Sequence, residues 1–159
     1  MQELLAARLI AVLATFDPSG SIHAVPMWYA ASGQAVILAT SSHSRKVDAL
    51  ERDPRATLVL HDSRPGFEVC GASIVGTVEI VRGTDAWPLI ELVHRRYVAA
   101  DGVADSAVHV FLASDDVALR LRPEAGLTWD ERDSEATAVM RSRAWGLPLV
   151  TTSPRRTIR

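Results

Sequence analysis

Short apolar runs separated by tight-turn signals dominate the first part of the sequence. Residues 9–16 form an almost uninterrupted apolar run, and Asp17-Pro-Ser-Gly20 follows it as a strong turn signal. Two further runs, over residues 21–29 and 34–40, are separated by a second turn signal at Ser32-Gly33. Runs of this length suit strands and are short for helices. We therefore predict an antiparallel β meander over residues 9–40.

The rest of the chain continues this pattern with helices inserted. Two helices are predicted, over residues 45–52 and 85–99, beside a short one at 2–8. Further strands are predicted over residues 55–61, 67–81, 108–112 and 117–121, the last two as a hairpin. Gly71 and Gly76 inside the longest strand indicate a bulge or bend. About six antiparallel strands with inserted helices predict a mainly β protein that forms a small barrel.

The overall composition limits the class of protein. The chain has 159 residues with 48% hydrophobic content, which suits one domain with a proper core. A net charge of −2 gives no basic field that would attract nucleic acid or an anionic membrane. The single cysteine fits a reducing compartment, and no apolar stretch approaches the ~20 residues that cross a bilayer. We expect a cytoplasmic protein that binds neither nucleic acid nor membrane.

The C-terminal part differs in character from the rest. Between Arg141 and Arg159 there are five arginines and no acidic residue. We therefore expect a folded domain over residues 1–130 and a C-terminal extension with a basic tail over 131–159, with a short helix at 134–145.

Hydroxyl and cationic side chains cluster between the third strand and the helix at 45–52, in the segment Thr40-Ser-Ser-His-Ser-Arg-Lys46. A helix start exposes unpaired N–H groups and the positive end of the helix dipole. This chemistry suits a phosphate group. The alternative is a capped surface helix with two solvated cations. The candidate ligands of a phosphate are Thr40, Ser41, Ser44, Arg45 and Lys46.

A second candidate segment lies in the strand at 21–29. Pro26 cannot donate to a β-ladder, so it indicates an edge strand or a backbone that faces something other than a strand. A flat aromatic cofactor needs free backbone groups for its polar edge and side chains that pack on its rings. The residues that could serve are Val25, Pro26, Met27 and Trp28. The alternative is an edge strand that only covers the core.

Other kinds of site find no support in the sequence. The five histidines are scattered and none pairs with a cysteine or carboxylate at a metal-ligand spacing, so no metal site is predicted. We expect His94 on a solvated helix flank and Asp115-Asp116 in a turn. No nucleotide-binding or nucleophile motif occurs, and no catalytic residue is assigned.

Taken in order, these pieces resemble the pyridoxamine 5′-phosphate oxidase-like, FMN-binding split-barrel superfamily over about residues 4–130. The segments that carry the resemblance are Ile10-Ala-Val-Leu-Ala-Thr15, Asp17-Pro-Ser-Gly20, His23-Ala-Val-Pro-Met-Trp-Tyr29, Ala39-Thr-Ser41, the stretch from Ser44 to Arg55, Gly76-Thr-Val-Glu79, Arg120-Leu-Arg-Pro-Glu124 and Trp129. The resemblance implies a split β-barrel homodimer with two cofactors in the grooves between its subunits. These cofactors would be FMN or the deazaflavin coenzyme F420.

The resemblance also implies roles for individual residues. Backbone and side chains of Val25, Pro26 and Met27 would face the isoalloxazine ring. Thr40 and Ser41 would bond the ribityl chain or phosphate, and Arg45 and Lys46 would pair with the phosphate. Arg120 or Trp129 from the other subunit would close the groove. Asp48 stands where a basic residue is common, which weakens the case for a strongly anionic cofactor tail.

The implied activity is that of an oxidoreductase that transfers hydride or electrons to a small planar organic substrate. Two alternatives stay open. One is a non-catalytic flavin- or haem-binding protein on the same barrel, with His23, His61 or His109 as an axial haem ligand. The other is a member that has lost its cofactor and serves as an interaction protein.

Overall fold

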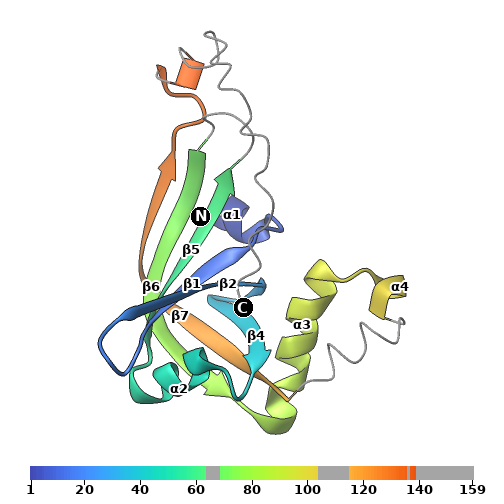
Figure 1. Ribbon diagram of the computed structural model, residues 1–159. Helices are drawn as coiled ribbons and strands as arrows, with labels where there is room; N and C mark the ends of the chain where they lie inside the picture. Colours follow the sequence, from blue (N-terminus) through green and yellow to red (C-terminus); the bar gives the residue numbers. More distant parts are fainter. Residues whose placement is uncertain (64–68, 104–114, 136, 139–159) are drawn as a thin grey trace, which may run out of the picture.

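The structure, a computed structural model, describes residues 1–63, 69–103, 115–135 and 137–138. This part of the chain is mainly β, with seven strands in one antiparallel sheet and a few helices (Figure 1). The strands are β1 Ala11–Phe16, β2 Ile22–Met27, β3 Tyr29–Ser32, β4 Ala35–Ser41, β5 Arg55–Ser63, β6 Val69–Val81 and β7 Asp116–Asp130. The helices are α1 Gln2–Ala6, α2 Arg45–Arg52, η1 Gly83–Asp85, α3 Trp87–Tyr97 and α4 Ala100–Val103. The predicted fold class is confirmed.

The order of strands shows how the sheet curls into a split barrel. The order is β2-β1-β5-β6-β7-β4-β3, so β2 and β3 form its two opposite edges. These two strands are nevertheless consecutive in the sequence and are joined by Trp28 alone. Because Met27 and Tyr29 are two residues apart, the two edges must approach each other at this point. The sheet therefore curls until its edges meet at Trp28.

The point at Trp28 where the two sheet edges meet, which we call the seam, shows that one strand of the predicted meander is wrong. The β1–β2 and β3–β4 hairpins are present, with Phe16 opposite Ile22 and Ser32 opposite Ala35. The run at 21–29, however, is not one strand. It divides at Trp28, which belongs to neither β2 nor β3. The Trp28 ring stacks on Tyr97 of α3, with ring centroids 5.0 Å apart and an interplanar angle of 4°. Residues before Trp28 pair with β1 and residues after it pair with β4.

The core of the barrel is built from alternate residues of the strands. On β1, Leu13 is fully buried, while Val12 and Phe16 are exposed on the opposite side of the strand. Helix α2 closes one end of the barrel with Val47 and Leu50, and α1 packs against the same core. A second apolar cluster lies between α3 and the outer face of β4 and β7. Its members include Ile37, Ile90, Val93 and Ala118.

The bend predicted in the long strand is confirmed as a bulge. The register between β6 and β7 shifts between Val75 and Gly76. A Cβ atom at Gly76 would collide with the carbonyl oxygen of Arg122 and lie 3.2 Å from Cα of Pro123. The two strands can therefore approach this closely only because residue 76 is glycine.

The C-terminal strand differs from the prediction. The segment 117–121 begins a much longer strand, β7, and residues 118–121 pair with β4 on one edge and β6 on the other. Because both edges are occupied, the hairpin predicted for this segment is wrong. Residues 108–112, its other predicted arm, lie outside the described residues, as do residues 139–145 of the predicted short helix and the rest of the tail.

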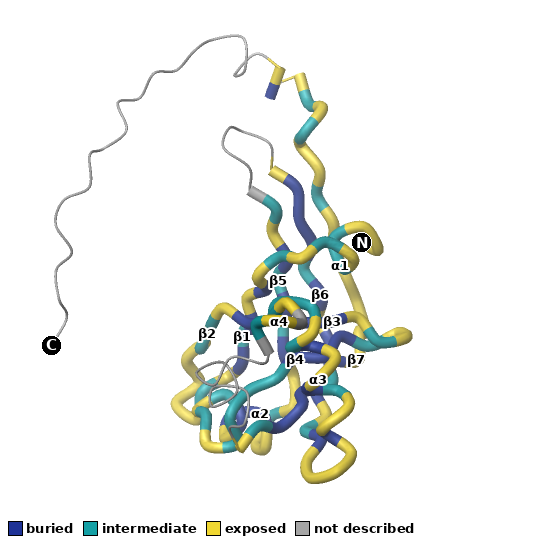
Figure 2. Tube along the Cα trace, turned by 90° about the vertical axis from the view of Figure 1, so that its right-hand side faces the viewer, coloured by how far each residue is buried: buried dark blue, intermediate teal, exposed yellow. Residues whose placement is uncertain are grey.

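One outer surface of the sheet exposes apolar side chains. We call it the outer apolar face and define it by Val12 (38% exposed), Phe16, Ile22 (70% exposed), Val75 (45% exposed) and Leu127. These residues lie on two pairs of neighbouring strands, β2 with β1 and β6 with β7, and β5 separates the two pairs. Figure 2 shows the exposed and buried segments of the chain. None of the described helices is long and apolar enough to cross a membrane.

Candidate functional site at the start of helix α2

The junction between β4 and α2 is shaped by the serines that precede the helix. Ser44 occupies the N-cap position with extended backbone angles (φ −78°, ψ 143°), as predicted, and its carbonyl accepts the N–H of Val47 at 2.8 Å. Its side chain makes no capping hydrogen bond. The hydroxyl instead lies 3.4 Å from Oγ1 of Thr40. The first turn of the helix therefore keeps N–H groups without an intrahelical acceptor.

Lys46 brings a cation to the same point. Its Nζ donates a hydrogen bond of 2.9 Å to Oγ1 of Thr40. Burial lowers the pKa of Lys46, and the nearby carboxylate of Asp116 opposes this by raising that pKa. The ammonium group of Lys46 is thus partly desolvated and hydrogen-bonded to the hydroxyl of Thr40. Among the predicted phosphate ligands, the structure brings together Thr40, Ser44 and Lys46.

Arg45 and Ser41 are engaged beside this cluster. Arg45 is largely exposed, and its guanidinium donates to Oδ2 of Asp17 in the β1–β2 turn at 2.9 Å. Hydrogen bonds from the backbone N–H and hydroxyl of Ser19, together with Arg45, hold the pKa of Asp17 at about 2. The hydroxyl of Ser41 accepts the N–H of His43 at 3.3 Å. An anion at this junction would have to share Arg45 with Asp17.

A largely buried pair of ionisable residues adjoins the cluster. Nε2 of His94 lies 3.9 Å from Oδ2 of Asp116, and each side chain is only 12% exposed. Burial lowers the pKa of His94, while Asp116 opposes this shift. The expectations of a solvated flank for His94 and a turn for Asp116 are both wrong. Asp116 pairs with Ser41 at the start of β7, and α3 packs over this strand.

His94 also contacts Trp28, the residue at which the two sheet edges meet. Its ring approaches Trp28 edge-on, with centroids 6.4 Å apart. Sequence reasoning missed His94 and Asp116 as neighbours of the candidate site. No local signal could have found them, because the arrangement joins residues from α2, α3 and β7 that lie far apart in the sequence.

The predicted ring-binding residues lie along the edge strand. Strand β2 is an edge of the sheet, as Pro26 predicted, and it pairs only with β1 in the described sheet. The side chain of Met27 is 7% exposed and that of Val25 packs against the core, so both point into the barrel. Pro26 is exposed on the outer side. Val25 and Met27 therefore do not present their side chains to a ligand outside the barrel.

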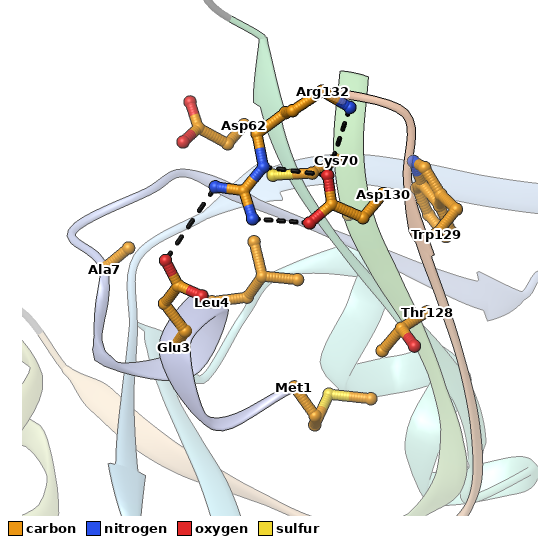
Figure 3. Close-up of a pocket in the computed structure, with 11 residues that line it drawn as sticks. Met1, Glu3, Leu4, Ala7, Asp62, Cys70, Thr128, Trp129, Asp130 and Arg132 are labelled. Carbon is orange, nitrogen blue, oxygen red and sulfur yellow. Dashed lines mark hydrogen bonds and ion pairs between the residues drawn. The ribbon is translucent and has the colours of Figure 1, made fainter. Parts of the chain in front are cut away.

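Arg120 and Trp129 lie away from Lys46 within one chain. Arg120 sits further along β7, where it pairs with Glu79 at 3.2 Å. Trp129 lies near the far end of β7, packed against Gly71. It lines a separate pocket of about 210 Å³, in which Arg132 contacts Asp130 and Glu3 (Figure 3).

The curled antiparallel sheet, whose two edges meet at one residue, defines a split β-barrel protein. The model of the family described as pyridoxamine 5′-phosphate oxidase matches residues 1–130. The chain belongs to this family, as the resemblance predicted. No curated protein sequence matches it.

Solved structures agree with this assignment. The conserved hypothetical protein Rv2991 from Mycobacterium tuberculosis is 28% identical, with 81% of each chain covered and a TM-score of 0.66. An F420 reductase is 24% identical over 79% of this chain and 94% of its own, with a TM-score of 0.61. The haem storage protein HutZ from Vibrio cholerae is 16% identical over 81% and 90% of the two chains, with a TM-score of 0.64. The last two similarities show the fold alone.

Proposed function

We propose that this protein is an oxidoreductase that binds FMN or the deazaflavin coenzyme F420 and anchors the cofactor phosphate at the start of α2. The single observation that carries this proposal is the half-buried ammonium of Lys46, 2.9 Å from Thr40 Oγ1 and next to the hydroxyl of Ser44. Family membership and the similarity to an F420 reductase support the choice of cofactor class.

The residues present fit a phosphate group. The hydroxyls of Thr40, Ser41 and Ser44 and the backbone N–H groups of Arg45 and Lys46 at the start of α2 supply neutral donors. Lys46 supplies a charge-assisted hydrogen bond, and Arg45 supplies another when the anion replaces Asp17. Hydrogen bonds to charged groups contribute roughly 1.5–3 kcal/mol each.

The ring of the cofactor would lie along the free edge of β2, from Val25 to Trp28. The backbone groups of this edge would hold the polar rim of the ring, and Trp28 would flank it. The bound cofactor supplies the hydride or electron transfer, while the chain binds it, orients it and excludes water. The substrate would be a small planar organic molecule that stacks on the ring.

We further propose that the protein acts as a homodimer. The outer apolar face, with Val12, Ile22 and Val75, supports this proposal because large exposed apolar patches typically mark association surfaces. Arg120 and Trp129 of the partner subunit are our candidates for closing the cofactor groove, because neither reaches Lys46 within its own chain.

Titration of the purified protein with FMN and with coenzyme F420 tests the proposal. Arg45→Ala and Lys46→Ala should each weaken binding at least about tenfold, because each removes a charge-assisted contact. Arg95→Ala is the matched control, since Arg95 is an exposed arginine that pairs with Glu91 on α3. The proposal is wrong if neither cofactor binds in the micromolar range.

The alternative is a non-catalytic haem-binding protein, a function supported by the similarity to a haem storage protein. His23 on β2 is partly buried and His61 on β5 is exposed, while His109 lies outside the described residues. A Soret band that forms with haemin and is lost in His23→Ala or His61→Ala would favour this function. If no Soret band forms, the haem alternative is wrong.

If the chain is a member that has lost its cofactor and serves in protein interaction, neither FMN nor coenzyme F420 will bind.

A further inference from the structure

A second cavity opens on the outside of the sheet, beside α3. It has a volume of about 460 Å³ and lies between the β3–β4 turn, the first turn of α3 and the middle of β7. Its apolar wall is formed by Ala35, Ile37, Leu89 and Pro123, and its polar wall by Ser32, Gln34, Arg120 and Arg122. Cavities of this size that combine apolar walls with a few polar groups are typical of small-molecule sites.

The polar wall carries an excess of positive charge. Arg120 and Arg122 both donate to the same carboxylate oxygen, Oε2 of Glu79, at 3.2 Å and 2.7 Å. Glu79 lies directly opposite Arg120 on β6. One carboxylate thus neutralises one of two guanidinium groups, and each guanidinium has five N–H donors. The remaining charge and donors are available to an anion in the cavity.

This cavity is distinct from the candidate phosphate site. Leu89, which lines the cavity, and His94, which adjoins the phosphate site, are five residues apart on α3. At 3.6 residues per turn they lie about 140° apart, on opposite flanks of the helix. Along β7, Arg120 is four residues from Asp116, a separation of about 13 Å.

We propose that the cavity binds a small organic carboxylate. The two arginines would hold the carboxylate with their forked donors, a geometry that guanidinium groups match well. The apolar body of the ligand would lie against Ile37 and Leu89. One chain forms all of these walls. Arg120 is also one of our two candidates for closing the cofactor groove of the partner subunit, so this inference requires that Trp129, and not Arg120, close that groove.

An NMR titration of the full-length protein with 2-naphthoate tests the site, with the neutral 2-naphthalenemethanol as the control ligand. The naphthoate should bind about tenfold more tightly than the alcohol, because only the carboxylate engages the arginines. Arg120→Gln and Arg122→Gln should each remove most of this difference. Glu79→Gln should strengthen naphthoate binding, because it removes the competing carboxylate. Arg95→Gln should change nothing.

Two results would overturn the inference. One is equal binding of the acid and the alcohol to the unmodified protein, a comparison that needs no variant. The other is displacement of naphthoate by FMN or coenzyme F420, which would make the cavity part of the cofactor groove. Arg122 is 66% exposed, so its replacement should leave the melting temperature unchanged and the comparison valid.

Discussion

At the scale of single residues, the proposed phosphate site depends most on Lys46. Its ammonium group is partly buried and donates a hydrogen bond to Thr40. Burial lowers the pKa of Lys46, and Asp116 raises it. A cation in this setting loses part of its hydration before any ligand arrives. An incoming phosphate can therefore interact with Lys46 more strongly than with an exposed lysine.

The lowered pKa of Lys46 gives a testable pH dependence. Phosphate binds the protonated amine, so FMN affinity should fall as the pH rises through the pKa of Lys46, which lies below the ordinary lysine value. Asp116→Asn should move this fall to lower pH, because Asp116 raises that pKa. Titrations of FMN across the alkaline range measure the effect, with riboflavin as the ligand that lacks phosphate. A fall of the same size in Lys46→Ala would refute the assignment.

Residue-scale chemistry could be predicted where it is local in the sequence. The segment from Thr40 to Lys46 shows its hydroxyls and cations within seven residues, and Ser44 was identified as the N-cap. The pairing of Arg45 with Asp17, and the placement of His94 beside Asp116, could not be read in the same way. These contacts depend on how distant strands and helices pack.

At the scale of elements, the β6–β7 ribbon depends on one close approach at Gly76. Gly76→Ala should destabilise the protein by roughly 1–3 kcal/mol or more, since the added Cβ meets the backbone of Arg122. Gly126→Ala on β7 is the matched control. Its Cβ would lie 3.1 Å from Cε of Met1, the end of a flexible side chain. Urea unfolding measures both, and equal midpoints for the two variants would contradict the proposed role of the bulge.

The elements also show where sequence patterns stop being informative. The helix at 45–52, the edge position of the Pro26 strand and the bend near Gly76 were all predicted from local signals. The division of residues 21–29 at Trp28 was not. An alternating pattern records which face each residue occupies but not which strand it pairs with, so a change of partner within one apolar run leaves no trace.

At the scale of the whole molecule, the outer apolar face leads to a prediction about assembly. The unmodified protein should sediment as a dimer, and Val75→Asp should yield monomers, because burying an unpaired charge in an apolar interface is costly. Leu92→Asp is the matched control, since Leu92 is 40% exposed on α3, similar to Val75 at 45%. Sedimentation velocity distinguishes these outcomes. A monomeric unmodified protein, or dissociation by Leu92→Asp instead, would contradict the assignment of this face.

The mainly β architecture could be predicted from the spacing of turn signals, because short apolar runs between tight turns leave few other arrangements. The closure of the sheet into a split barrel could not be predicted in this way, because it depends on the order in which the strands pair. The surface through which two subunits associate could not be predicted from the sequence either, because the resemblance implies a dimer but does not identify its interface.

The most direct test of the anchoring site compares the affinities of FMN and riboflavin, which differ only in the phosphate. In the unmodified protein FMN should bind at least about tenfold more tightly. In Lys46→Ala this ratio should fall towards one while riboflavin affinity stays the same. If the ratio is unchanged in Lys46→Ala, the phosphate is held somewhere other than the start of α2.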